Sequence, residues 1–102
     1  MTDRQLLKAT RQFRDGILEG RSSDRMCFMV CFALQGFLSA CGLETLLIEA
    51  EFRDTNHVWL QLPDGRVLDP TADQFGLAPV YLGQIEVLLD QFPPLVQVSD
   101  GQ

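Results

Sequence analysis

The chain has 102 residues and a formal net charge of −6, with 14 Asp and Glu residues against eight Lys and Arg. This length fits one domain with a modest core, so we expect a single domain over residues 1–102. The hydrophobic content of 46% is typical of a soluble globular protein. The acidic balance argues against a nucleic-acid partner, which would normally need a basic face.

The three cysteines cannot all pair, and their positions are more typical of reduced intracellular thiols than of a disulfide framework. The first 25 residues are rich in charge and contain no signal-peptide hydrophobic region. We therefore expect a cytoplasmic protein.

A first helix is predicted near the N-terminus, where Thr2 and Gln5 have the spacing of a capping box. The apolar stripe that follows consists of Leu6, Ala9, Phe13 and Ile17, flanked by Leu7 and Leu18. The residues expected on or near its solvent side are Arg11, Gln12, Arg14 and Asp15. Gly20 is a plausible stop for this helix.

Residues 26–42 form an almost entirely apolar segment that predicts a second helix. Its candidate N-caps are Ser22, Ser23 and Asp24, and Gly42 ends it. A length of 17 residues is at the lower edge for a transmembrane span. A helix that is hydrophobic all round is equally explained by cover on all sides, so we expect a buried central helix and no membrane contact.

Strands dominate the rest of the chain. Residues 43–52 predict a strand in which Glu49 and Glu51 alternate outward. A hairpin over residues 56–69 follows. The elements expected after it are an edge strand at 80–82, two helical turns within 84–92 and a strand at 95–98. Helices followed by an antiparallel sheet define an α+β domain, with the central helix packed on a small sheet.

The hairpin carries the one histidine of the chain, His57. Its loop, Pro63-Asp64-Gly65, predicts a three-residue turn with glycine in the left-handed position. The register that results puts Trp59 opposite Asp69 and His57 opposite Thr71. His57 and Asp69 then project from one face as diagonal neighbours, about 7–8 Å apart at the backbone. A carboxylate that orients an imidazole is half of a nucleophilic site.

A nucleophile is available upstream in Cys27, in the first turn of the second helix. The positive end of the helix dipole favours a thiolate there and lowers the pKa of the thiol. The free N–H groups of the same turn can receive a developing oxyanion. His57 would shuttle the proton, and Asp69 would fix the tautomer of His57.

These residues together resemble the transglutaminase-like superfamily, which shares its core with papain-like cysteine proteases. The matching residues are Cys27, His57 with Trp59, and Asp69 with Pro70 and Thr71. The resemblance covers roughly residues 22–76. It implies a Cys-His-Asp triad without a cofactor, acting on a protein or peptide amide by transglutamination, deamidation, peptide hydrolysis or another acyl transfer. Members usually carry a small residue before the cysteine, whereas Arg25 and Met26 stand there in this chain.

Three further side chains are candidates for the same site. Trp59 is expected to pack beside it or to wall a substrate groove. Asn56 and Gln74 are candidates to donate a hydrogen bond to the oxyanion or to hold the substrate amide. Cys31 and Cys41 are expected in the core, because both belong to the apolar helix outside its first turn.

Two alternatives stand beside the enzyme hypothesis. A zinc site built from Cys27, Cys31, His57 and Asp69 fits poorly the two-pair ligand spacing of structural zinc sites, so we expect no metal. The other alternative is a non-catalytic module that uses the same fold to bind a peptide or to inhibit a partner.

Overall fold

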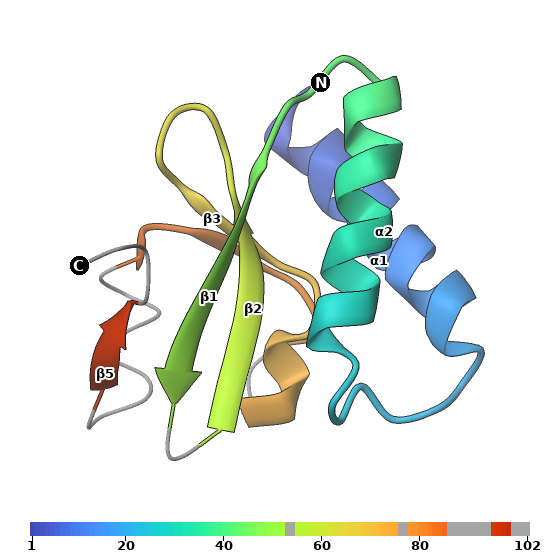
Figure 1. The fold of residues 1–102 in the computed structure, drawn as a ribbon. Coiled ribbons are helices and arrows are strands. Elements are labelled where there is room, and N and C mark those ends of the chain that lie inside the picture. Colours follow the sequence, from blue (N-terminus) through green and yellow to red (C-terminus); the bar gives the residue numbers. More distant parts are fainter. Residues whose placement is uncertain (53–54, 76–77, 86–94, 99–102) are drawn as a thin grey trace.

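Two helices and an antiparallel sheet make up the protein in a computed structural model that describes residues 1–52, 55–75, 78–85 and 95–98 (Figure 1). The helices are α1 (Asp3–Leu18) and α2 (Cys27–Ala40), and a 3-10 helix, η1, spans Ala72–Phe75. The strands are β1 (Leu46–Phe52), β2 (Thr55–Gln61), β3 (Val67–Asp69), β4 (Tyr81–Gly83) and β5 (Leu95–Val98). Their order in the sheet is β4-β3-β2-β1-β5. The helices precede the sheet, which confirms the predicted α+β fold.

The start of α1 agrees with the predicted capping box. The N–H of Gln5 donates to Thr2 Oγ1 over 3.1 Å, and the N–H of Thr2 donates to Gln5 Oε1 over 2.8 Å. At the other end Glu19 adopts a left-handed conformation, with φ of 53°, and Gly20 follows with φ of 83°. The helix therefore stops beside the predicted glycine.

The buried side of α1 differs from the predicted stripe. Its buried residues are Leu6, Thr10, Arg14 and Leu18. Arg14 was expected near solvent, but it is only 4% exposed, and its Nη2 donates to Asp73 Oδ2 over 3.0 Å. Ser23 Oγ donates to the other oxygen of the same carboxylate over 2.6 Å. The prediction for Arg14 is wrong because its partner lies 59 residues further along the chain.

The start of α2 also departs from the prediction. The N-cap position is Met26, with no side-chain cap, and Cys27 is the first helical residue. Ser22 accepts a hydrogen bond from the N–H of Asp24 instead, and Ser23 donates to Asp73. The predicted cap residues Ser22 and Ser23 therefore make their hydrogen bonds within and from the connection between the helices, and they do not cap α2.

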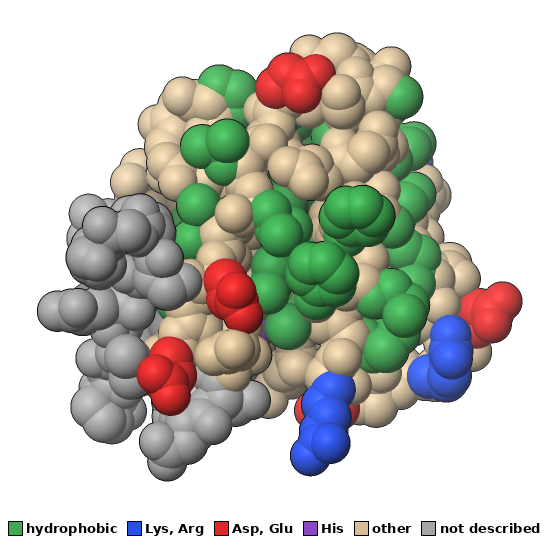
Figure 2. Space-filling view, viewed as in Figure 1, with side chains coloured by type: hydrophobic (Ala, Val, Ile, Leu, Met, Phe, Trp, Pro, Cys, Tyr) green, Lys and Arg blue, Asp and Glu red, His purple; other side chains and the backbone are tan. Residues whose placement is uncertain are grey.

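One face of α2 is buried and the opposite face is open, so the expectation of cover on all sides is wrong. The fully buried residues are Val30, Cys31, Leu34 and Leu38. Cys31, Leu34 and Leu38 pack with sheet residues that include Val58 and Leu60. On the outer face Phe28 is 57% exposed, Met29 55% and Phe32 63%. Figure 2 shows hydrophobic side chains gathered over α2. The sheet and α1 do not enclose the helix completely. Among the described residues, no helix is long and apolar enough to cross a membrane.

The hairpin has the predicted register. The N–H of Leu62 donates to the carbonyl of Arg66 over 2.8 Å, and Gly65 has φ of 91°. The strand pairs are Leu60 with Leu68 and Gln61 with Val67. The same register places Trp59 opposite Asp69, because one further step along each antiparallel strand preserves the pairing.

The remaining elements follow the predictions with small shifts. β1 starts at Leu46 rather than at residue 43, the edge strand β4 covers 81–83 instead of 80–82, and β5 occupies the predicted 95–98. The helical turns predicted within 84–92 lie largely outside the described residues, which omit 86–94. The 3-10 helix η1 was not predicted, and Asp73 and Gln74 lie on it.

We expect replacement of Arg14 by Leu to destabilise the fold, because it removes the cation that faces the partly buried Asp73 carboxylate. The expected loss in the free energy of unfolding is about 2–3 kcal/mol. Arg11 is the matched control on the same helix, since its ion pair with Asp15 is exposed and its loss should change stability by less than about 0.5 kcal/mol. Urea denaturation followed by circular dichroism measures both. Equal effects of the two variants would contradict a stabilising role for the Arg14–Asp73 pair.

Candidate active site

A fully buried pair, His57 and Asp69, lies on β2 and β3. His57 Nε2 is 2.7 Å from Asp69 Oδ2. The other carboxylate oxygen, Oδ1, accepts the N–H of Thr71 over 3.0 Å, in a turn across Pro70. Both oxygens of Asp69 are therefore held, which fixes the direction in which the carboxylate meets the imidazole.

Cys27 lies at the first position of α2. Its thiol interacts with the His57 side chain, and His57 and the backbone N–H groups of Val58 and Phe28 each lower the pKa of the thiol. The side chain is 9% exposed, whereas His57 has no exposed surface. Because Nε2 of His57 is bonded to Asp69, the imidazole connects the thiol to the carboxylate. The structure thus brings together the three residues that the sequence nominated.

The environment shifts the pKa values of the thiol and the imidazole in opposite directions. Burial raises the pKa of Cys27, but the hydrogen bond and the charge of His57, with two backbone N–H groups, outweigh burial and bring the pKa below its usual value. Burial lowers the pKa of His57, but the hydrogen bonds with Asp69 and Cys27 and their charges raise the pKa to about 9. The two shifts favour a thiolate–imidazolium pair.

The loop before Cys27 is tied to the same region by Gln74. Arg25 has φ of 62°, a left-handed conformation that strains residues other than glycine by about 1–3 kcal/mol. The N–H of Arg25 donates to Gln74 Oε1 over 3.1 Å, and Gln74 Nε2 donates to Thr71 Oγ1 over 2.9 Å. Since Thr71 in turn holds Asp69, Gln74 connects the loop that leads into Cys27 with the residue that positions the carboxylate.

The other nominated side chains have different surroundings. Trp59 is buried, and its ring centroid lies 5.9 Å from that of His57, so it packs beside the site rather than lining an open groove. Asn56 is exposed and its Nδ2 donates to Glu49 over 3.0 Å. Gln74 uses its amide within the loops described above. The side-chain amides of Asn56 and Gln74 are therefore both engaged within the chain.

The two remaining cysteines differ from each other. Cys31 is fully buried as predicted, and its Sγ lies 3.3 Å from the carbonyl oxygen of Val58. Burial, with the nearby charges of Asp69 and Cys27, raises the pKa of Cys31 well above its usual value. Cys41 is exposed at the end of α2, so its predicted place in the core is wrong. All three thiols are free.

The sequence reasoning missed the bracing residues Ser23, Arg14 and Asp73. Their signal is weak, because a serine in a loop and an arginine on an amphipathic helix are ordinary features of solvated surfaces. The one hint was the polar pair Asp73 and Gln74, which follows the Asp-Pro-Thr segment after Ala72.

Metal-binding side chains and cavities can also mark a functional site. Within the described part of the chain, no group of three or more His, Cys, Asp or Glu side chains is placed to hold a metal ion. Cavities of about 320 and 280 Å³ lie around Leu62 and Pro63, beyond the other end of α2. A third, of about 400 Å³, borders Arg14 and Asp73. None of these three is lined by Cys27.

The arrangement is that of a thiol, an imidazole and a carboxylate in sequence at a helix N-terminus. No protein-family model, curated protein or solved structure matches this chain.

Replacement of Asp69 by Asn should lower the pKa of His57 from about 9, because the amide removes the negative charge that stabilises the imidazolium. The loss of that cation in turn should raise the pKa of Cys27. The pH range in which the thiolate and imidazolium coexist then becomes narrower, because the thiolate forms at a higher pH and the imidazolium loses its proton at a lower pH. Titration of the thiolate absorbance near 240 nm checks this in wild type and variant, both carrying Cys41→Ala. Identical titration curves would contradict the assigned coupling.

Replacement of Gln74 by Met should loosen the loop before Cys27, since Met keeps the length of the side chain but bonds neither Arg25 nor Thr71. We expect about 1–2 kcal/mol of lost stability from these hydrogen bonds and a several-fold slower alkylation of Cys27 at pH 7. Gln12→Met on the exposed side of α1 is the control. A Gln74 variant that loses stability but keeps the alkylation rate would show that the residue does not position the thiol.

Proposed function

We propose that this protein is a thiol-dependent enzyme that transfers or hydrolyses acyl groups of protein or peptide amides. Cys27 acts as the nucleophile, His57 as the proton carrier and Asp69 as the residue that orients His57. The observation that carries the proposal is the placement of both partners about one imidazole: Asp69 Oδ2 lies 2.7 Å from Nε2, and the Cys27 thiol is near enough for the thiol and the imidazole to shift each other's pKa.

The proposed reaction has two stages. The Cys27 thiolate attacks the amide carbonyl carbon, and the electron pair of the C=O bond moves onto the oxygen. The intermediate collapses to a thioester as the C–N bond breaks, and the imidazolium of His57 gives its proton to the departing amine. Water or an acceptor amine then attacks the thioester, and His57 takes the proton of that nucleophile. The thiolate leaves and the cycle is complete.

The N-terminal turn of α2 supports this chemistry in two ways. Its N–H groups point out of the helix end beside Cys27, and no side chain in the described structure caps them. They are suited to hold the negative oxygen that forms in the first stage. The helix dipole also stabilises the thiolate before attack. Both effects follow from the position of Cys27 as the first residue of the helix.

The sequence motifs add support of a different kind. Cys27, His57 with Trp59, and Asp69 with Pro70 and Thr71 resemble the transglutaminase-like superfamily, in which the corresponding residues form a triad that acts on amides. The free state of the three thiols supports the further proposal of a reducing, cytoplasmic setting.

A second candidate function is a non-catalytic peptide-binding module. The exposure of Phe28, Met29 and Phe32 favours it, because a contiguous exposed apolar face commonly marks an interaction site. Under this alternative, Cys27→Ala keeps the biological effect of the protein. Under the proposed function, the same variant folds normally and loses all turnover.

Alkylation by iodoacetamide at pH 6 tests the proposal directly. An ordinary thiol with a pKa of about 8.5 is less than about 1% ionised there, so an activated Cys27 should react about tenfold faster than Cys41. Mass spectrometry of the digested protein gives the rate at each cysteine, and His57→Ala should abolish the difference. The proposed nucleophile is excluded if Cys27 reacts no faster than the exposed Cys41.

A further inference from the structure

The apolar outer face of α2 begins next to the proposed nucleophile. We call Phe28, Met29 and Phe32 the α2 outer surface; each is more than half exposed. The rings of Phe28 and Phe32 stack with centroids 5.7 Å apart, which makes one flat apolar platform from two successive turns. In the space-filling view, hydrophobic side chains gather into one patch over α2 (Figure 2). Phe28 directly follows Cys27, so this surface and the thiol share a helical turn.

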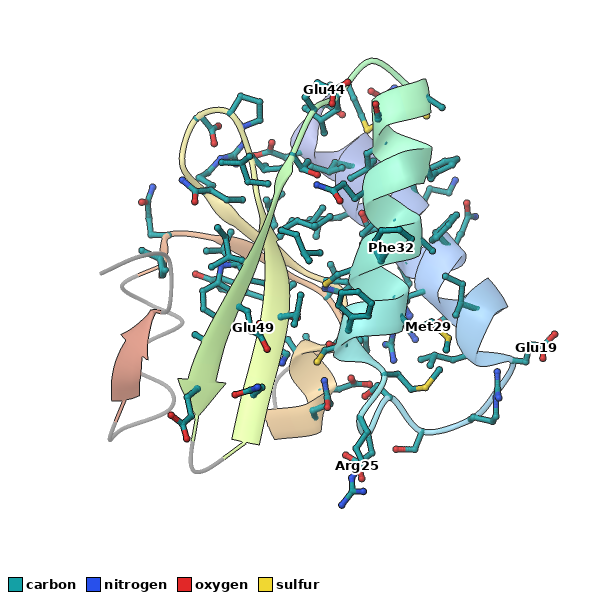
Figure 3. The ribbon with its side chains drawn as sticks, viewed as in Figure 1. Glu19, Arg25, Met29, Phe32, Glu44 and Glu49 are labelled. Carbon is teal, nitrogen blue, oxygen red and sulfur yellow. The ribbon has the colours of Figure 1, made fainter. Side chains whose placement is uncertain are left out.

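An acidic border lies beside this surface, on β1. Glu49 and Glu51 are both exposed. They are two residues apart on the strand, so their side chains lie on the same face. Glu49 is paired with Val58, which belongs to the core between the sheet and α2, so the two carboxylates lie on the side of the sheet that α2 covers. Figure 3 shows Glu49 on β1, with Phe32 on the helix that lies next to β2, Met29 at the far edge of that helix, and Arg25 beyond the helix N-terminus. Apolar and acidic groups therefore adjoin each other near Cys27.

We infer that the α2 outer surface and its acidic border bind the substrate of the proposed reaction, a polypeptide segment with an apolar side chain beside the reacting amide and a basic side chain a few residues away. This inference rests on the proposed function and names its substrate class. The apolar side chain packs on Phe28 and Phe32, and the basic side chain lies near Glu49 and Glu51. The contact with Phe28 brings the adjoining amide to Cys27.

Charge decides between this occupant and a second copy of the chain. Each copy carries a net charge of −6, so two copies repel each other, whereas a basic peptide is attracted to the same surface. A second copy seated on Phe28 would also cover the turn that carries Cys27. A cationic polypeptide can bind to the acidic border through its basic side chain while its reacting amide lies at the Cys27 thiol.

The binding experiment uses full-length protein with Cys27→Ala, which keeps the surface and cannot turn over the probe. The probe is a rhodamine-labelled peptide amide with phenylalanine next to glutamine and lysine three residues away, titrated by fluorescence anisotropy. We expect Phe32→Ser to raise Kd about fivefold to tenfold, the scale of one lost apolar contact. Leu46→Ser is the control, because Leu46 is equally exposed but lies on β1 outside the surface, and it should leave Kd unchanged.

The charge test compares this peptide with a matched one that has glutamate in place of lysine. The lysine peptide should bind several-fold more tightly, and added salt should reduce the preference. Glu49→Gln with Glu51→Gln should abolish the preference. Glu19→Gln with Glu44→Gln changes the net charge equally at exposed positions elsewhere, and it should keep most of the preference.

The outcomes separate this inference from the proposed function. If Cys27 is activated but neither Phe32→Ser nor the Glu49 and Glu51 variant changes Kd, the inference about the α2 outer surface is wrong and the proposed function stands. Binding as expected, with a Cys27 that alkylates no faster than Cys41, overturns the reaction and with it the role of the bound peptide as substrate. The inference is also overturned if the lysine peptide shows no binding at concentrations up to about 1 mM. It is overturned as well if sedimentation shows a dimer of the protein that Phe32→Ser dissociates.

Discussion

The contact between His57 and Asp69 is the constraint on which the rest of the site depends. Two polar side chains with no exposed surface are stable in a small core only if each meets a well-placed partner. Asp69 meets this requirement with one oxygen on the imidazole and the other on the N–H of Thr71. The contact also needs the hairpin register, since a one-residue slip would turn one of the two side chains to the opposite face.

The segment after Asp69 extends this constraint to the helices. Thr71 is hydrogen-bonded to Asp69 and to Gln74. Gln74 accepts a hydrogen bond from the backbone N–H of Arg25. The carboxylate of Asp73 accepts hydrogen bonds from Arg14 and Ser23. A short 3-10 helix thereby joins the sheet to both α1 and the connection that precedes α2. The position of the Cys27 sulfur relative to the imidazole follows from these bonds, because they fix where α2 starts.

Features with local causes could be predicted from the sequence. The hairpin register follows from Pro63-Asp64-Gly65, and the start of α1 follows from the pairing of Thr2 with Gln5, because in both cases the interacting groups lie within a few residues of each other. His57 and Asp69 could be paired for the same reason. The approach of Cys27 to His57 needs a contact across 30 residues, and only the helix-end position and a family resemblance pointed to it.

Features with distant causes could not be predicted. Arg14 has a helical spacing that suits solvent, and its burial depends on Asp73 in another element. The open face of α2 was missed because composition reports that a helix is apolar but not how many neighbours surround it. Ser22 and Ser23 have the chemistry of N-caps, yet the loop turns at Arg25 and starts the helix later than these residues.

Met26 at the N-cap position shows how stability and reactivity oppose each other in so small a domain. A serine or aspartate at such a position commonly contributes about 1 kcal/mol by accepting a hydrogen bond from the first turn. The thioether of methionine is at best a weak acceptor, so α2 forgoes that contribution. The backbone hydrogens stay available to an anionic guest from outside the chain. Under the proposed function, the hydrogen bond that a capping side chain would make is given up so that the same N–H groups can bind a negatively charged oxygen, a trade-off between stability and activity.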